Sequence, residues 1–69
     1  MKEIRDCKGR LVCKAEPTDG LVETAYKHQV TKTRLPIGGV FTIERDGIRT
    51  VIKRSGNAEL NINSIVFKI

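Results

Sequence analysis

The chain has 69 residues, a length typical of one small domain. It contains no Trp, one Tyr and two Phe, so its core must be built mainly from Ile, Val and Leu. No apolar run approaches the roughly 20 residues that a membrane-spanning helix needs, and the first six residues lack the apolar stretch of a secretory signal. We therefore expect a soluble, cytoplasmic protein.

Thirteen basic residues against eight acidic ones give the chain a net charge of +5. Such an excess favours an acidic partner, which could be nucleic acid, an anionic membrane or an acidic protein. The basic residues are dispersed, however, and no run of four or more occurs. Most of them are therefore expected on the solvated faces of strands.

Residues 2–16 are predicted to form a first β-hairpin with two possible registers. If Lys8-Gly9 is a two-residue turn, Ile4 lies opposite Cys13. One face then carries four apolar side chains: Ile4, Leu11, Cys13 and Ala15. If the loop instead has three residues and ends in a bulge at the same Gly, Ile4 lies opposite Val12. The sequence leaves both registers open.

The two cysteines, Cys7 and Cys13, are not expected to form a disulfide. In the register of the two-residue turn their cross-strand pairs are three residues apart, roughly 10 Å at the rise of a strand. A disulfide needs Cα atoms within about 7 Å of each other. Two unpaired thiols also fit a reducing compartment, in agreement with a cytoplasmic location.

Residues 16–20 are predicted to form a turn, because they include Pro, Asp and Gly. Residues 21–26 follow as a strand, although the spacing of their apolar residues also fits a helix. We favour the strand because a Gly turn suits a hairpin and no capping box introduces a helix. Residues 30–35 alternate and predict a further strand, which Pro36 ends.

The clearest signal in the chain is a hairpin at residues 40–53, where two β-branched, apolar runs flank Asp46-Gly47. Asp and Gly tolerate the positive φ angles of a two-residue turn. In the resulting register Glu44 lies opposite Arg49 as an attractive pair. The apolar residues of both strands then share one face: Phe41, Ile43, Ile48 and Ile52.

The C-terminal residues 60–69 contain two alternating apolar sets. The first set is Leu60 and Ile62, and the second is Ile65, Phe67 and Ile69. The alternation changes phase at Asn63-Ser64, which predicts a bulge or a tight corner there. An apolar strand of this kind needs a partner, either by closing the sheet or by pairing with another chain.

Together these elements predict a single all-β domain over residues 1–69. Its expected architecture is a small antiparallel meander of about six or seven short strands, closed as a small barrel or folded as a two-layer sandwich. The single core of so short a chain contributes roughly 3–5 kcal/mol of stability unless a partner adds to it.

No constellation of residues predicts catalysis, a metal site or a cofactor. A structural zinc site needs four ligands, whereas the soft ligands of the chain are Cys7, Cys13 and His28. The sequence places no carboxylate beside His28, as a catalytic triad would need. The Gly38-Gly39 turn does not open a helix, as phosphate-binding loops do. We expect a protein that is not an enzyme.

Protein–protein contact, which includes self-association as a homodimer, is the favoured function, because the core is small and the C-terminal segment is apolar. The candidate interaction strand carries Ile65, Phe67 and Ile69. We infer neither a membrane partner nor a small-molecule substrate.

Nucleic-acid binding is the alternative function. If their strands are neighbours, five basic residues could line one groove: Lys32, Arg34, Arg49, Lys53 and Arg54. Small β-barrels that bind single strands also use aromatic rings on which bases stack. Tyr26 is the one ring expected to be exposed, and this shortage weighs against the alternative.

Three short segments of the N-terminal third resemble one group of proteins: Ile4-Arg5-Asp6, residues 9–15 and Gly20-Leu21-Val22-Glu23. They are similar to short uncharacterised proteins of bacterial mobile elements and prophages. The resemblance implies a bacterial or phage accessory protein of the cytoplasm. It carries over no activity, cofactor or site residue.

Overall fold

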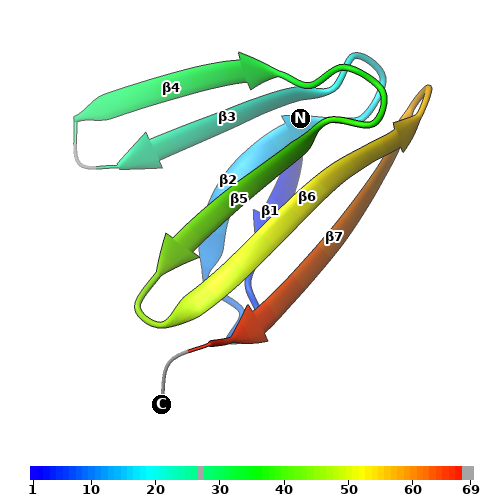
Figure 1. The fold of residues 1–69 in the computed structure, drawn as a ribbon. Helices are drawn as coiled ribbons and strands as arrows, with labels where there is room; N and C mark the ends of the chain where they lie inside the picture. The colour runs from blue at the N-terminus through cyan, green and yellow to red at the C-terminus, as the bar shows by residue number, and fades with distance from the viewer. Residues whose placement is uncertain (27, 68–69) are drawn as a thin grey trace.

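The structure, a computed structural model, describes residues 1–26 and 28–67, apart from the side chain of Tyr26. The described residues form seven antiparallel strands (Figure 1). They are β1 (Lys2–Arg5), β2 (Leu11–Glu16), β3 (Leu21–Tyr26), β4 (Gln29–Arg34), β5 (Val40–Arg45), β6 (Ile48–Gly56) and β7 (Glu59–Val66). Residues 21–26 are therefore a strand, as predicted, and not part of a helix.

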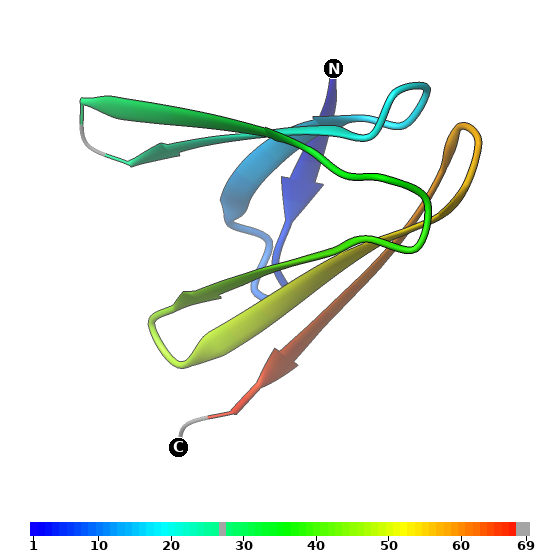
Figure 2. The ribbon, with the colours of Figure 1, turned by 45° about the horizontal axis from the view of Figure 1, so that its top comes forward.

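The strands form two sheets, with the order β1-β2-β3-β4 in the first and β5-β6-β7 in the second. Figures 1 and 2 show that the second sheet lies across β1 and β2, while the β3–β4 hairpin extends beyond it. Among the described strands no pairing closes a sheet into a barrel. The predicted all-β antiparallel meander is confirmed, whereas the predicted closure is not.

The core lies between the two sheets and is built from aliphatic and small side chains. The buried cluster consists of Ile4, Val12, Cys13, Ala15, Val22, Leu35 and Ile52. Three half-buried side chains of the second sheet pack against it: Phe41, Ile43 and Leu60. Ile52, at the centre of β6, is fully buried and is the main contribution of the second sheet to this cluster.

The central hairpin has the predicted register, since all six expected pairs form. Asp46 and Gly47 occupy the turn with φ angles of 53° and 77°. Glu44 and Arg49, predicted as partners, form an ion pair at 2.7 Å. The predicted apolar face points toward the first sheet, with its members buried or half-buried: Phe41, Ile43, Ile48 and Ile52.

The loop of the first hairpin follows the three-residue form. The Asp6 N–H donates to the carbonyl of Arg10 and the Gly9 N–H to the carbonyl of Asp6, each at 2.9 Å. The buried Asp6 carboxylate accepts the amides of Lys8 (2.9 Å) and Arg10 (3.0 Å). Burial opposes ionisation of this carboxyl, but these amides and the Arg10 charge outweigh burial and lower the pKa of Asp6.

A bulge in β2 sets the register of the rest of this hairpin. Arg5 pairs with Leu11 but Ile4 pairs with Cys13, so Val12 is an extra residue in β2. Ile4 therefore lies opposite Cys13, as the two-residue form predicts. Because of the bulge, Val12 and Cys13 are both buried, whereas Leu11 is exposed. The two-residue form also placed Leu11 on the apolar face, and that part of it was wrong.

The predicted bulge at Asn63-Ser64 is also wrong, because β7 pairs with β6 without interruption from Leu60 to Val66. The register shift lies instead in β6, between Arg54 and Gly56. Two apolar sets of β7 and its extension therefore face opposite sides of the sheet: Leu60 and Ile62 point inward, and Ile65 and Phe67 point outward.

Ser64 takes an inward position in β7 because it finds polar partners there. Its hydroxyl lies 3.2 Å from that of Thr50, a buried residue of β6, and accepts the N–H of Cys7 at 3.0 Å. These bonds connect β7 to β6 and to the loop of the first hairpin. Ser64 is a polar residue at an inward position, and this explains the change of phase in the apolar pattern of residues 60–69.

Arg54 ties the second sheet to the turns of the first. Its Nη1 donates to the carbonyl oxygens of Asp19 (3.2 Å) and Leu35 (2.9 Å), and its Nη2 donates to that of Thr18 (3.4 Å). Gly20 lies against this side chain with φ +75°. A Cβ at Gly20 would lie 2.5 Å from the Leu35 oxygen and 2.8 Å from the Arg54 Cδ.

Gly20→Ala is expected to destabilise the protein more than Gly9→Ala. Both glycines have positive φ angles, +75° and +81°, so each Ala costs about 1–2 kcal/mol in backbone strain. Only Gly20→Ala adds a clash, because no atom lies within 4 Å of a Cβ at Gly9. Urea denaturation of the two variants measures the difference. Equal losses of stability would contradict the close approach of Arg54 to Gly20.

The two cysteines are free thiols in different surroundings. Cys7 is exposed in the loop of the first hairpin, and Cys13 is buried in the core. Burial raises the pKa of the Cys13 thiol from 9.0 to about 11, with a smaller opposing effect of the Arg45 charge. The folded chain therefore keeps this proton at pH values where the unfolded chain releases it.

We expect the free energy of unfolding to fall as the pH rises above about 9, where the unfolded Cys13 thiol loses its proton. Between this pH and about 11 the unfolded chain binds fewer protons than the folded one, so a higher pH favours unfolding. By pH 10.5 the loss from this thiol amounts to about 2 kcal/mol. Chemical denaturation at pH 8 and pH 10.5 measures it.

Cys13→Ala is the control, because it keeps every other group that titrates in this range. The variant loses packing at all pH values, but its stability should depend less on pH than that of the natural chain. The same pH dependence in both proteins would show that Cys13 is not the group responsible.

Candidate functional site

β7 is an edge strand of the second sheet and differs from the other edges. Among the described strands, β7 pairs with β6 and with no strand on its other side. Natural proteins protect open edges with charges, prolines, bulges or short strands. β7 is eight residues long, is regular, and has Glu59, its first residue, as its one charge. Each of β1, β4 and β5 carries at least two charged residues within four to six residues.

The backbone groups at this edge can be identified from the pairing of β7 with β6. The Phe67 N–H donates to the carbonyl of Gly47 at 2.9 Å, and the Arg54 N–H donates to that of Gly39, on the β5 side, at 3.0 Å. Because hydrogen-bonded pairs alternate in an antiparallel ladder, the odd-numbered residues of β7 bond to β6. The residues whose N–H and C=O groups point away from β6 are Leu60, Ile62, Ser64 and Val66.

The predicted interaction residues Ile65 and Phe67 lie on the outer face of the second sheet, 48% and 43% exposed. Arg49 lies opposite Ile65 in the sheet, and its guanidinium carbon is 4.8 Å from the centre of the Phe67 ring. The Arg49 guanidinium also binds Glu44, so its position over the ring is fixed from two sides. Ile69, the third predicted residue, lies outside the described residues.

Two inward-facing side chains of β7 are also left partly uncovered. Ile62 is 39% exposed and Val66 is 50% exposed, although each pairs with a buried residue of β6. Both lie in β7, an edge strand of the second sheet. β7 therefore presents apolar side chains on both faces along with an unpaired backbone edge.

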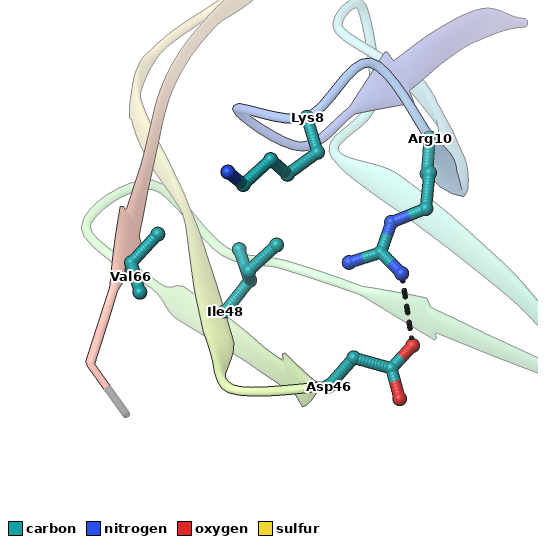
Figure 3. A pocket seen from close by; sticks show the side chains of 5 residues that line it. All are labelled: Lys8, Arg10, Asp46, Ile48 and Val66. Atoms are coloured by element: carbon teal, nitrogen blue, oxygen red, sulfur yellow. Dashed lines mark hydrogen bonds and ion pairs between the residues drawn. The ribbon is translucent and has the colours of Figure 1, made fainter. Parts of the chain in front are cut away.

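A groove of about 510 Å³ lies at the end of β7 (Figure 3). Lys8 and Arg10 reach into it from the loop of the first hairpin, and Asp46, Ile48 and Val66 face them. Arg10 binds Asp46 at 3.0 Å across the groove. Within the part of the chain that the structure describes, Lys8 has no ion pair, and the apolar wall beside it is formed by Ile48 and Val66.

The five basic residues that were predicted to line one groove lie in three separate parts of the structure. Lys32 and Arg34 lie on β4 at an edge of the first sheet, Arg49 and Lys53 lie on the outer face of β6, and Arg54 reaches the turns of the first sheet. β4 and β6 belong to different sheets, so they are not neighbours. The ring of Tyr26, predicted as exposed, lies outside the described residues.

Four of these basic residues already have partners. Lys32 lies 3.9 Å from Glu23 and Arg34 lies 3.3 Å from Asp19. Arg49 binds Glu44, and Arg54 binds backbone carbonyls. Lys53 is exposed and has no ion pair among the described residues. Nucleic-acid binding by this set stays a prediction.

The residues that the structure describes contain no group of three His, Cys, Asp or Glu side chains that could hold a metal ion. They also contain no helix with the length and apolar character needed to cross a bilayer. His28 is exposed in the turn that precedes β4.

Sequence reasoning missed three residues that shape the surface of β7. Val66 was not singled out, and Ser64 and Thr50 were not recognised as a pair of inward hydroxyl groups. Thr50 stands directly opposite Ile43 in the predicted hairpin, so its place on the apolar face could have been read from the sequence. The pairing of Ser64 with Thr50 depends on the order of strands, which the sequence does not state.

Comparison of the chain with protein families, with curated proteins and with solved structures gives no match.

Proposed function

We propose that this protein is a non-enzymatic protein-binding module and that β7 is its binding surface. The observation that carries the proposal is the open edge of β7, which is long, regular and nearly uncharged. Exposed apolar side chains are supplied by three residues of β7 and by the residue that follows it: Ile62, Ile65, Val66 and Phe67. Edges of this kind accept a strand from another chain, and the added strand is held by main-chain hydrogen bonds.

Backbone contacts and side-chain contacts have different roles in such a complex. The backbone groups of four β7 residues give affinity, because each hydrogen bond contributes about 0.5–1.5 kcal/mol net. The side chains give specificity, since alternate residues of an added strand point to the inner and outer faces of the sheet. A partner with apolar residues at alternate positions fits the exposed side chains of β7.

The pairing of the basic residues supports this function over nucleic-acid binding. Lys32, Arg34 and Arg49 would have to exchange a carboxylate for a phosphate, and Arg54 would have to leave the turns that it holds. Affinity for an oligonucleotide that falls steeply with added salt would instead favour the alternative. The bacterial or phage origin and the cytoplasmic location implied by the N-terminal resemblance belong to this proposal too.

A peptide with the sequence of residues 59–66 is expected to bind to the edge of β7. In a titration of the ¹⁵N-labelled protein, the amide signals that shift should be those of Leu60, Ile62, Ser64 and Val66, because their N–H groups gain acceptors. NMR spectroscopy with increasing peptide concentration measures these shifts.

The matched control is the same peptide with Ile62→Pro and Ser64→Pro. Proline has no N–H group and cannot donate to a ladder, so this peptide should leave the spectrum unchanged. Equal shifts with both peptides, or no shift with either in protein dilute enough to be monomeric, would refute the proposal that the β7 edge accepts a strand.

A further inference from the structure

We infer that the partner of β7 is the β7 strand of a second copy of this chain. The two strands run antiparallel about a two-fold axis at Asn63 and join two three-stranded sheets into one sheet of six strands. This inference rests on the proposed function and adds the identity of the partner and the register of pairing.

The register follows from the directions of the backbone groups. The free N–H and C=O groups belong to even-numbered residues on both copies, so even-numbered residues must face each other as hydrogen-bonded pairs. An axis at Asn63 places Ile62 opposite Ser64 of the second copy, and Leu60 opposite Val66 of the second copy. This register uses every residue from 60 to 66. With an axis at Ile62 or Ser64, one end of each β7 strand would have no residue of the other β7 strand opposite it.

The side chains of β7 are complementary to themselves in this register. On the inner face, Leu60 of the second copy lies beside Val66, the half-exposed residue at the wall of the groove. Ile62 lies opposite Ser64 of the second copy, so the second strand covers part of its exposed side chain as well. The exposed apolar side chains on the inner face thus lose contact with water without any change in the fold of either copy.

Charge also favours this arrangement. The centre of β7 is uncharged, so two copies do not repel each other there. Glu59 has no ion pair among the described residues, and its side chain accepts a hydrogen bond from Ser55 at 2.8 Å. In the proposed register Glu59 lies opposite Phe67 of the second copy, whose ring is covered by the Arg49 guanidinium. The one charge of β7 therefore lies near the Arg49 guanidinium, which Glu44 also binds.

Cross-linking through cysteine tests both the partner and the register. Asn63 faces Asn63 of the second copy as a non-hydrogen-bonded pair, in which the Cα atoms lie about 4.5 Å apart, a distance that a disulfide spans. Asn63→Cys is made together with Cys7→Ser, which removes the exposed natural thiol. Under mild oxidation this variant should form a covalent dimer.

Asn61→Cys, also together with Cys7→Ser, is the matched control. Asn61 is exposed on the same face of the same strand, but the two copies of residue 61 lie roughly 14 Å apart in this register. We expect cross-linking of the Asn63→Cys variant to be at least ten times faster than that of the Asn61→Cys variant, as measured on non-reducing gels. Equal rates would overturn the register.

Light scattering of the Cys7→Ser protein at two concentrations separates this inference from the proposed function. A dimer whose fraction increases with concentration supports the inference. If the protein is a monomer that binds the peptide of residues 59–66, the proposed function is supported, but the inference that the partner is a second copy is overturned. A monomer that does not bind the peptide overturns both.

Discussion

The contact between the inward faces of the two sheets is the interaction on which the rest of this structure depends. Ile52 of β6 packs into a cluster that is otherwise supplied by β1, β2, β3 and Leu35. Arg54 fixes the same two layers at one end through the carbonyl oxygens of the first sheet. A chain of this length can bury one such layer of side chains. In the second sheet this layer is centred on β6, the middle strand, and not on the edge strands.

That position of the core determines what remains exposed. β7 contributes Leu60 to the core, but Ile62 and Val66 farther along the strand are partly open to solvent. The outer face has no covering layer among the described elements, so Ile65 and Phe67 are exposed beside Arg49. The exposed apolar side chains on the inner face of β7 thus have one cause, which is that the small core covers only the Leu60 end of this strand.

The sequence determines much of this fold where short-range chemistry is sufficient. Asp46-Gly47 sets the register of the central hairpin, because few other residues accept two positive φ angles in succession. The register of the first hairpin could not be predicted in the same way, because its loop and its strands follow different registers and the bulge at Val12 joins them. The bulge brings both Val12 and Cys13 into the core. The stability gained by burying both side chains depends on the second sheet, so it cannot be predicted from residues 2–16 alone.

The surface of β7 could be predicted only in part. Ile65 and Phe67 were found because they alternate, yet Ser64 was misplaced because its partner Thr50 is 14 residues away. Arg54 was expected in a nucleic-acid groove, but its acceptors lie 19 to 36 residues away in turns of the other sheet. Such contacts follow from the order and stacking of strands, and a local pattern of residues does not contain that information.

In the proposed dimer, the edge of β7 is a binding surface that a second copy of the chain occupies. Amide hydrogen exchange at low and high protein concentration shows whether this edge is covered. The amides of Asn61, Asn63 and Ile65 should exchange slowly at both concentrations, because they donate to β6. Those of Ile62, Ser64 and Val66 should exchange quickly in dilute solution and become protected as the concentration rises. Equally fast exchange of these three amides at every concentration would contradict the proposed dimer.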